Sequence, residues 1–277
     1  MENASGVVLV SENFLHIIDW SRPWLRSILP AAKKVLAQPD WRAKINQLAQ
    51  DASLTNQRNL PLQFVPQSEL PAQTAYESHI AATGQVPTRE NLHDFFNALV
   101  WLSFPAIKRE LNALQAAQIA DNGIKQTRGK ARDAATIFDE NAAFLVAQNT
   151  EEGRRLIEQL QHHEWQAAFL QQRSLFSTQA EVWCFGHALM EKLVQPYKSI
   201  TAHAMVVFTE ADFFAFNDDT KLLWLDQHIA QRLSKRSLST SDFTPLPVAG
   251  VPGWWPEQDA SFYADESVFR AKRSNLL

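Results

Sequence analysis

Residues 91–105, NLHDFFNALVWLSFP, form the stretch that most constrains the fold. At 100° per residue, its apolar side chains surround nearly the whole circumference of a helix, which is typical of a buried helix. This helix nevertheless carries His93, Asp94 and Asn97. Because an unpaired buried polar group costs about 1–3 kcal/mol, these three side chains must either bond neighbouring backbone or line a pocket. The sequence leaves both alternatives open.

The composition describes a folded, mildly acidic chain. Its 277 residues are 45% hydrophobic and 20% charged with a net charge of −4, which is typical of a globular protein and argues against a dedicated nucleic-acid binder. No apolar run approaches the roughly 18 residues of a membrane span, and Glu2 and Glu12 do not fit a signal peptide. We therefore expect a cytoplasmic protein without a nucleic-acid or membrane partner. The single cysteine, Cys184, excludes an internal disulfide and a multi-thiolate zinc site.

Hydrophobic periodicity predicts an α+β fold that is mostly helical. Beyond the opening stretch, helices are expected over PAAKKVLA, DWRAKINQLAQ, AYESHIAAT, IKRELNALQAAQIA, residues 150–173, HALMEKLV and DDTKLLWLDQHIAQRL. Strands are expected at LQFV, EVWCF and ITAHAMVVF. We expect one compact domain over 1–277 with a small antiparallel or mixed sheet. It comprises a helical and proline-rich region 1–75, a core 76–245, and a turn-rich wrapping tail 246–277.

In RDAATIFDEN (132–141) and the AFLV that follows, the runs TIF and AFLV predict two strands joined by a tight turn at DEN, a β-hairpin. Asp139, Glu140 and Asn141 would lie at its tip, where acidic and amide residues are common for reasons of turn geometry alone. The alternative is that the two carboxylates serve a site. Arg128 and Arg132 precede this hairpin and form either a solvated basic loop or contacts to an anionic ligand.

A second constellation lies in FGHALMEKL, residues 185–193. His187 and Glu191 are four residues apart, so their side chains share one helix face. The pair could bind one metal ion, or Glu191 could orient His187 as a general base. An ordinary surface or core hydrogen bond is the competing interpretation. The strand–glycine–helix junction favours the first two alternatives, since such junctions present the first helical residues to a cavity.

These residues together predict a site for one divalent ion, namely zinc, manganese or iron, in a metal-dependent hydrolase. His93, His187 and Glu191 are the expected catalytic residues. The candidate metal ligands are His93, Asp94, Asp139, His187, Glu191 and His203, with Glu140 as a further carboxylate. The candidate contacts to a small anionic, for example phosphorylated, substrate are Asn97, Lys108, Arg128 and Arg132. The spacing does not match HExxH or another dense ligand motif.

Two rival interpretations use the same residues. In a non-catalytic binding or scaffold protein, they form a closed hydrogen-bond network that orders the core. In a metal-free acid–base enzyme, the His187–Glu191 pair acts alone in an open pocket. Convergence of His93 and His187 at a solvent-reachable cleft would favour a metal site. The sequence gives no oligomeric state.

Four segments resemble a bacterial family known as a domain of unknown function, number 3025. They are TGQVPTRENLHDFFNALVWLSFPAIKRELNAL, RDAATIFDEN, FGHALMEKL with ITAHAM, and PGWWPEQDASFYADESVFR, in that order over residues 76–273. The resemblance implies one compact unit and brings no activity or catalytic residues. The family pattern has a glycine after DEN, whereas this sequence has Ala142, which argues against a glycine-dependent turn there.

Overall fold

The structure is a computed structural model that describes residues 14–122, 130–236 and 238–272, without the side chains of 121, 122 and 130–132. Within that part of the chain the α-helices are α1 (Leu29–Val35), α2 (Trp41–Asp51), α3 (Tyr76–Thr83), α4 (Leu92–Ser103), α5 (Pro105–Asn122), α6 (Lys130–Asn141), α7 (Glu151–Gln161), α8 (His187–Lys192), α9 (Asp212–Ala215), α10 (Asp218–Lys235) and α11 (Ala260–Tyr263). The strands are β1 (Gln63–Pro66), β2 (Gln85–Thr88), β3 (Ala142–Gln148), β4 (Ala180–Cys184), β5 (Thr201–Thr209) and β6 (Phe243–Pro247).

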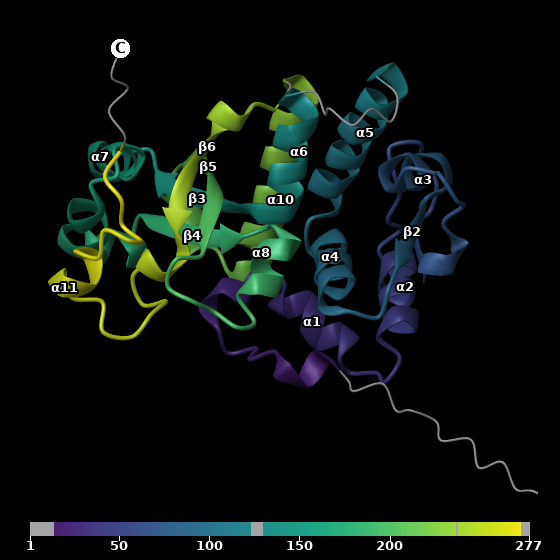
Figure 1. The fold of residues 1–277 in the computed structure, drawn as a ribbon, viewed down its shortest axis with the longest axis horizontal. Coiled ribbons are helices and arrows are strands. Elements are labelled where there is room, and N and C mark those ends of the chain that lie inside the picture. The colour runs from purple at the N-terminus through teal and green to yellow at the C-terminus, as the bar shows by residue number, and fades with distance from the viewer. Residues whose placement is uncertain (1–13, 123–129, 237, 273–277) are drawn as a thin grey trace, which may run out of the picture.

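The strands form two small sheets. The larger has the order β4-β3-β5-β6, in which β3 and β5 are parallel and the two outer pairs are antiparallel. The other is a parallel pair of β1 and β2. Helices α4, α5, α6 and α8 lie beside one another between the two sheets (Figure 1). The predicted α+β fold, mostly helical with a small mixed sheet, is therefore confirmed. Its subdivision at residues 75 and 245 stays a prediction.

The predicted hairpin at Asp139–Asn141 is wrong. RDAATIFDEN belongs to α6, which runs directly into β3 at Ala142. Ala134, Ala135 and Phe138 are buried, and their spacing places them on one helix face against the core. A short apolar run such as TIF does not separate a strand from a buried helix by periodicity, which explains the error.

Helix α4 confirms the buried character of the opening stretch. Every residue from 94 to 101 is buried. The side chain of Asn91 caps the helix by accepting the backbone N–H of Asp94 at 2.8 Å. Phe95 packs edge-to-face on Trp41 of α2 with ring centroids 5.3 Å apart. This burial fixes the rotation of α4 and therefore the direction in which His93 points.

Four phenylalanines beneath the candidate site hold its supporting elements together. Phe104, Phe138, Phe144 and Phe185 come from the α4–α5 junction, α6, β3 and the β4–α8 junction. All four are fully buried, and their ring centroids lie 5.0–5.9 Å apart in the contacts between them. Large rigid rings in close contact fix the relative positions of the elements that carry them. The elements that carry His93, Glu140 and His187 therefore share one aromatic base.

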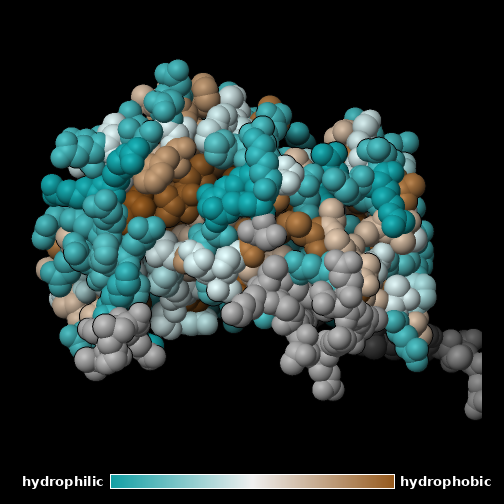
Figure 2. Space-filling view, turned by 90° about the horizontal axis from the view of Figure 1, so that it is seen from above, coloured by the Kyte–Doolittle hydropathy of each residue, from teal (hydrophilic) through white to brown (hydrophobic). Residues whose placement is uncertain are grey.

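The surface seen from above is mostly hydrophilic around an apolar recess in its left half (Figure 2). Phe208, on β5, is a large apolar residue that is 38% exposed.

Among the described residues, no helix has the length and apolar character to cross a membrane. The cytoplasmic location stays a prediction.

Candidate metal centre

A glycine places helix α8 against the end of helix α6. Gly186 precedes His187, and a Cβ at Gly186 would lie 2.5 Å from the backbone nitrogen of Asn141 and from the carbonyl oxygen of Glu140. The backbone N–H groups of Phe185 and Gly186 both donate to the carbonyl of Ala142, at 3.0 and 2.8 Å. Only a residue without a side chain permits this approach. The first residue of α8 consequently lies beside Glu140.

Three side chains from α4, α6 and α8 converge at this junction. His93 Nε2 lies 3.1 Å from His187 Nε2, and the carboxylate of Glu140 lies 3.5 Å from His187 Nε2. One nitrogen or oxygen atom from each of the three residues falls within 4.8 Å of the other two. Zn–N bonds of about 2.0–2.1 Å put two ligand atoms about 2.9–3.4 Å apart for octahedral to tetrahedral angles. The spacing of the three donors is therefore compatible with one shared ion, given small adjustments.

The outer nitrogens of both histidines face groups that set their tautomers. Glu191 Oε2 accepts a hydrogen bond from His93 Nδ1 at 2.9 Å, which leaves the lone pair of His93 on Nε2. The backbone carbonyl of Asp139 lies near His187 and favours a proton on that ring, although Nδ1 makes no full hydrogen bond. With both protons on Nδ1, the two Nε2 lone pairs would face each other, an arrangement that a divalent cation could bridge.

Burial sets the charge of the two inner groups. Desolvation is the main cause that lowers the pKa of His187 to about 3, against the opposing effect of Asp139, so this imidazole is neutral near pH 7. Burial also raises the pKa of Glu140, helped by the neighbouring charge of Asp139. The neutral imidazole suits a metal site as it is, since a ligating histidine must be neutral, whereas Glu140 would need the cation to favour its ionised carboxylate.

Water can reach this cluster from one side. The side chains of His93, Glu140 and Glu191 are 30%, 40% and 38% exposed, whereas His187 is 4% exposed. The convergence and the access that the sequence left as a test are therefore both present. Glu191, expected to pair with His187 on its own helix, instead reaches across to His93.

A separate network next to the cluster is closed. Lys108 Nζ forms an ion pair with Asp139 Oδ1 at 2.5 Å and donates to Asn97 Oδ1 at 2.9 Å. Asn97 Nδ2 then donates to the hydroxyl oxygen of Tyr76 at 3.2 Å. Burial favours a neutral Asp139, but Lys108 and then His187 outweigh it and hold the pKa of Asp139 below its ordinary value. Lys108, Asn97 and Asp139, expected at the site, thus lie in a structural network at its edge.

The other predicted site residues lie apart from the cluster. Asp94 forms a bidentate ion pair with Arg89, at 2.9 and 3.0 Å. His203 Nδ1 bonds the side chain of Asn141 at 3.0 Å, on β5. The side chain of Arg132 and all of Arg128 lie outside the described residues.

A cavity of about 340 Å³ adjoins the centre. It lies between the start of α3, the second half of α5 and the end of α6, and Glu140 belongs both to its wall and to the three-residue cluster. Its lining is Ala75, Tyr76, Glu77, Gln115, Ile119, Thr136, Asp139 and Glu140. A ligand in this cavity would therefore contact the centre through Glu140.

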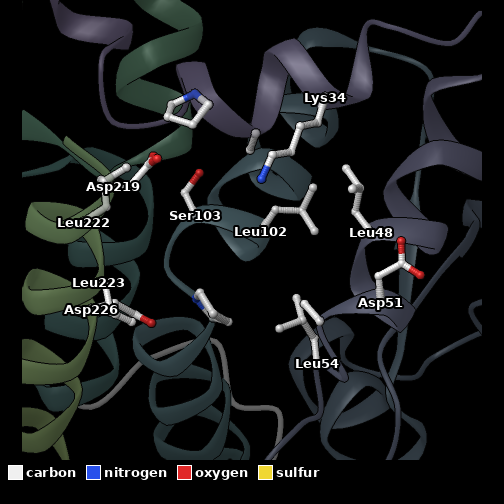
Figure 3. A pocket seen from close by; sticks show the side chains of 14 residues that line it. Lys34, Leu48, Asp51, Leu54, Leu102, Ser103, Asp219, Leu222, Leu223 and Asp226 are labelled. Atoms are coloured by element: carbon white, nitrogen blue, oxygen red, sulfur yellow. The ribbon is translucent and has the colours of Figure 1, made fainter. Parts of the chain in front are cut away.

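A larger cavity of about 620 Å³ lies elsewhere, between α1, α2, α10 and the α4–α5 junction. Figure 3 shows Leu48, Leu54 and Leu102 around it, with Lys34 at its edge. Its most buried carboxylate, Asp226, accepts the backbone N–H groups of Ala106 and Ile107 and so caps α5. No histidine is among the described residues that line it.

A family model described as protein of unknown function, DUF3025, matches residues 62–273. The chain belongs to this family. The match covers α3 to α8 and therefore every residue of the centre. No curated protein and no solved structure matches the chain. Membership confirms the resemblance seen in the sequence and adds no activity.

Proposed function

We propose that His93, Glu140 and His187 bind one divalent metal ion and that the protein is a metal-dependent hydrolase. The observation that carries the proposal is the convergence of two imidazole Nε2 atoms, 3.1 Å apart, with a carboxylate 3.5 Å from one of them. Two histidines and one glutamate form the protein ligand set of several catalytic zinc sites. Three protein ligands leave room for a water molecule, which the partial exposure of His93 and Glu140 admits.

Metal-assisted hydrolysis fits this arrangement because a bound divalent ion lowers the pKa of a ligated water and polarises a substrate oxygen. The chain's own residues would orient the ligands. Glu191 holds the ring of His93 through Nδ1, the relation that carboxylates have to ligating histidines in many metal sites. Its 38% exposed carboxylate is also available to accept a proton from solvent.

The three ligands restrict the identity of the metal without fixing it. Zinc accepts this ligand set in hydrolases, and iron(II) accepts two histidines and one carboxylate in oxygen-using enzymes. Manganese is the third metal expected from the sequence. The identity of the bound metal is therefore the first datum that the hydrolase proposal needs.

The closed-network interpretation is the second candidate. The bonds from Glu191 to His93 and from His93 to His187 could order the core without a metal. The 40% exposed Glu140 counts against it, because the members of a closed network are satisfied by one another and not by solvent.

The decisive experiment is elemental analysis of the full chain purified without chelator or affinity-tag metal, before and after incubation with zinc, manganese or iron(II). We expect near-stoichiometric metal in the parent and its loss in His93→Ala, His187→Ala and Glu140→Gln. The matched control is His203→Ala, a histidine outside the cluster, which should retain the metal. Circular dichroism establishes that each variant is folded. A parent without metal after all three incubations overturns the proposal.

Hydrolysis is tested on the metal-loaded protein with chromogenic ester, amide and phosphoester substrates. Turnover that disappears in Glu140→Gln and persists in His203→Ala supports the hydrolase. Stoichiometric iron(II) together with oxygen consumption, and no hydrolysis in the panel, would replace the hydrolase with an oxygen-using enzyme at the same centre.

A further inference from the structure

The cavity beside the metal centre has an acidic wall. Glu77, Asp139 and Glu140 line it, and no lysine or arginine within the described ranges does so. Lys108 neutralises Asp139 by their ion pair, whereas neither Glu77 nor Glu140 forms an ion pair with a described lysine or arginine. Two carboxylates therefore face the cavity with the charge of Lys108 nearby but without a direct ion pair to a described lysine or arginine.

An amide inside the same cavity also lacks a partner. Gln115 is only 6% exposed, yet its side chain makes no hydrogen bond to any part of the chain that the structure describes. Neither amide atom of Gln115 is among the fully enclosed unpartnered atoms, so both are accessible to water or a ligand. Gln115 offers both a donor and an acceptor to whatever fills the cavity.

The closed network next to the cavity orients a third polar group. Lys108 can only donate, so Asn97 must present its carbonyl oxygen to Lys108 and its amide hydrogens to Tyr76. The oxygen of Tyr76 is thus an acceptor from Asn97, and its own proton must point elsewhere. Tyr76 lines the cavity. Its O–H is therefore not used by Asn97 and remains able to donate to another acceptor.

We propose that this cavity is the substrate pocket of the hydrolase and that it selects substrates carrying a protonated amine, with the ammonium group at Glu77 and the bond to be hydrolysed toward Glu140 and the metal centre. The inference rests on the proposed function. An ammonium donates to carboxylates, and its position leaves the Tyr76 O–H for an oxygen of the same substrate. Glu77 is held in place by Asn112, whose side-chain nitrogen donates to its carboxylate at 2.6 Å.

A second metal ion explains the acidic wall less well than an organic cation. In the described part of the chain, His93, Glu140 and His187 are the one set of three possible ligands within 4.8 Å of one another, and Glu77 is not among them. Burial, assisted by Asp139, raises the pKa of Glu77 to about 7, so a bound cation would supply the counter-charge that its carboxylate lacks.

This selectivity differs from the anionic substrate favoured by the sequence. That prediction depended on Lys108, Arg128 and Arg132. Lys108 is already engaged by Asp139 and Asn97, so Arg128 and Arg132 alone would have to carry it. Inorganic phosphate is therefore the probe for the opposing hypothesis.

The test is isothermal titration calorimetry of the full chain, with its metal content measured in parallel, against three probes. L-Leucinamide carries an amine and a hydrolysable amide, N-acetyl-L-leucinamide is its uncharged counterpart, and inorganic phosphate is the anion. We expect L-leucinamide to bind at least about ten-fold more tightly than the acetylated probe, which corresponds to about 1.4 kcal/mol. Phosphate should not compete.

Two variants separate charge recognition from general contact. Glu77→Gln keeps the hydrogen-bonding shape beside Asn112 and should abolish the preference for the charged probe, whereas Gln115→Ala should weaken both amide probes equally. Glu69→Gln, at an exposed position, is the matched control and should behave as the parent. Equal affinity for the two amides, no binding of L-leucinamide at about 10 mM, or tighter binding of phosphate overturns the inference.

The outcomes for the metal and for the pocket are independent. A parent that holds metal but shows no preference for the amine refutes the pocket and leaves the metal centre intact. A metal-free parent that still prefers the amine, with loss of the preference in Glu77→Gln, refutes the hydrolase and leaves the recognition of a cation.

Discussion

Asp139 and Glu140 are neighbours in sequence but belong to two different kinds of polar region. The side chain of Asp139 is 10% exposed and paired with Lys108, whereas that of Glu140 is 40% exposed and faces two histidines. The first region is closed, because each charge has an opposite charge and a hydrogen bond. The second is open, because its nitrogen and oxygen atoms converge where His93 and Glu140 are exposed to solvent. A closed region contributes to a specific fold, and an open one is available to a ligand.

The largest effect should come from breaking the closed pair. Lys108→Met leaves the buried carboxylate of Asp139 without its cation, and we expect it to lower the free energy of unfolding by about 3–5 kcal/mol in urea denaturation. The double variant Lys108→Met with Asp139→Leu removes both charges and should recover most of that loss. Equal destabilisation of the single and double variants would contradict the view that the pair is a self-contained structural unit.

Glu77 offers an intermediate case, a buried carboxyl without a cationic partner. Its pKa is about 7 in the folded chain against 4.5 ordinarily, chiefly because of burial. Between these values the unfolded chain releases the proton first, so stability falls as pH rises, by up to about 3 kcal/mol. Glu77→Gln should remove this fall, giving a variant more stable than the parent above pH 7.

The readout for Glu77 is the difference between thermal unfolding curves of variant and parent from about pH 4 to 8. Asp226, whose pKa burial raises to about 6, contributes a fall of the same sign in both proteins and so cancels. Glu69→Gln should leave the parent's slope unchanged. If the Glu77→Gln curve keeps that slope, the carboxyl is ionised in the folded protein and the buried-acid description is wrong.

Both histidines of the proposed centre were candidates on the sequence, whereas the position of the acidic residue beside them was not. The buried circumference of α4 and the strand–glycine–helix pattern before His187 singled out the two histidines, and the structure brings them together. Asp139 and Glu140 were treated alike because the predicted hairpin put both at one tip. In α6 the two are about 100° apart, so one faces Lys108 and the other faces the histidines.

Two further features of the structure could not be predicted from sequence patterns, for physical reasons. Strand β2, QVPT, contains Pro87 and pairs with β1 in a register in which Gln85 lies opposite Gln63, so neither alternation nor length revealed it. The bond from Glu191 to His93 joins residues 98 positions apart, and only the packing of α8 on α4 creates it. Local spacing instead pointed Glu191 at His187.

Gly186 allows the open region to be displaced without altering any of its side chains. Gly186→Ala inserts a Cβ against the backbone of residues 140–142, and α8 must move away. We expect a loss of about 1–3 kcal/mol in stability together with weaker metal binding. The control is Gly253→Ala, where a Cβ meets no atom within 4 Å but φ is +83°, so that stability falls with metal affinity unchanged. Equal metal affinity in the two variants would show that the α6–α8 approach does not position the ligands.

The finest distinction between the two regions is at Glu191, which touches a proposed ligand without being one. In an open metal centre, its carboxylate orients His93 through Nδ1, so Glu191→Gln should weaken metal affinity about 10–100-fold. Competition with a metal-binding dye measures that change. Because Glu191 is 38% exposed and its bond to His93 is near the surface, the melting temperature of the metal-free protein should barely change. A closed network predicts the opposite pair of results. The metal-free protein would lose stability, since His93 and His187 depend on Glu191 for their order, and the metal affinity would stay the same. Glu191→Gln therefore separates a carboxylate that serves a ligand site from one that serves the fold, even though both make the same 2.9 Å bond.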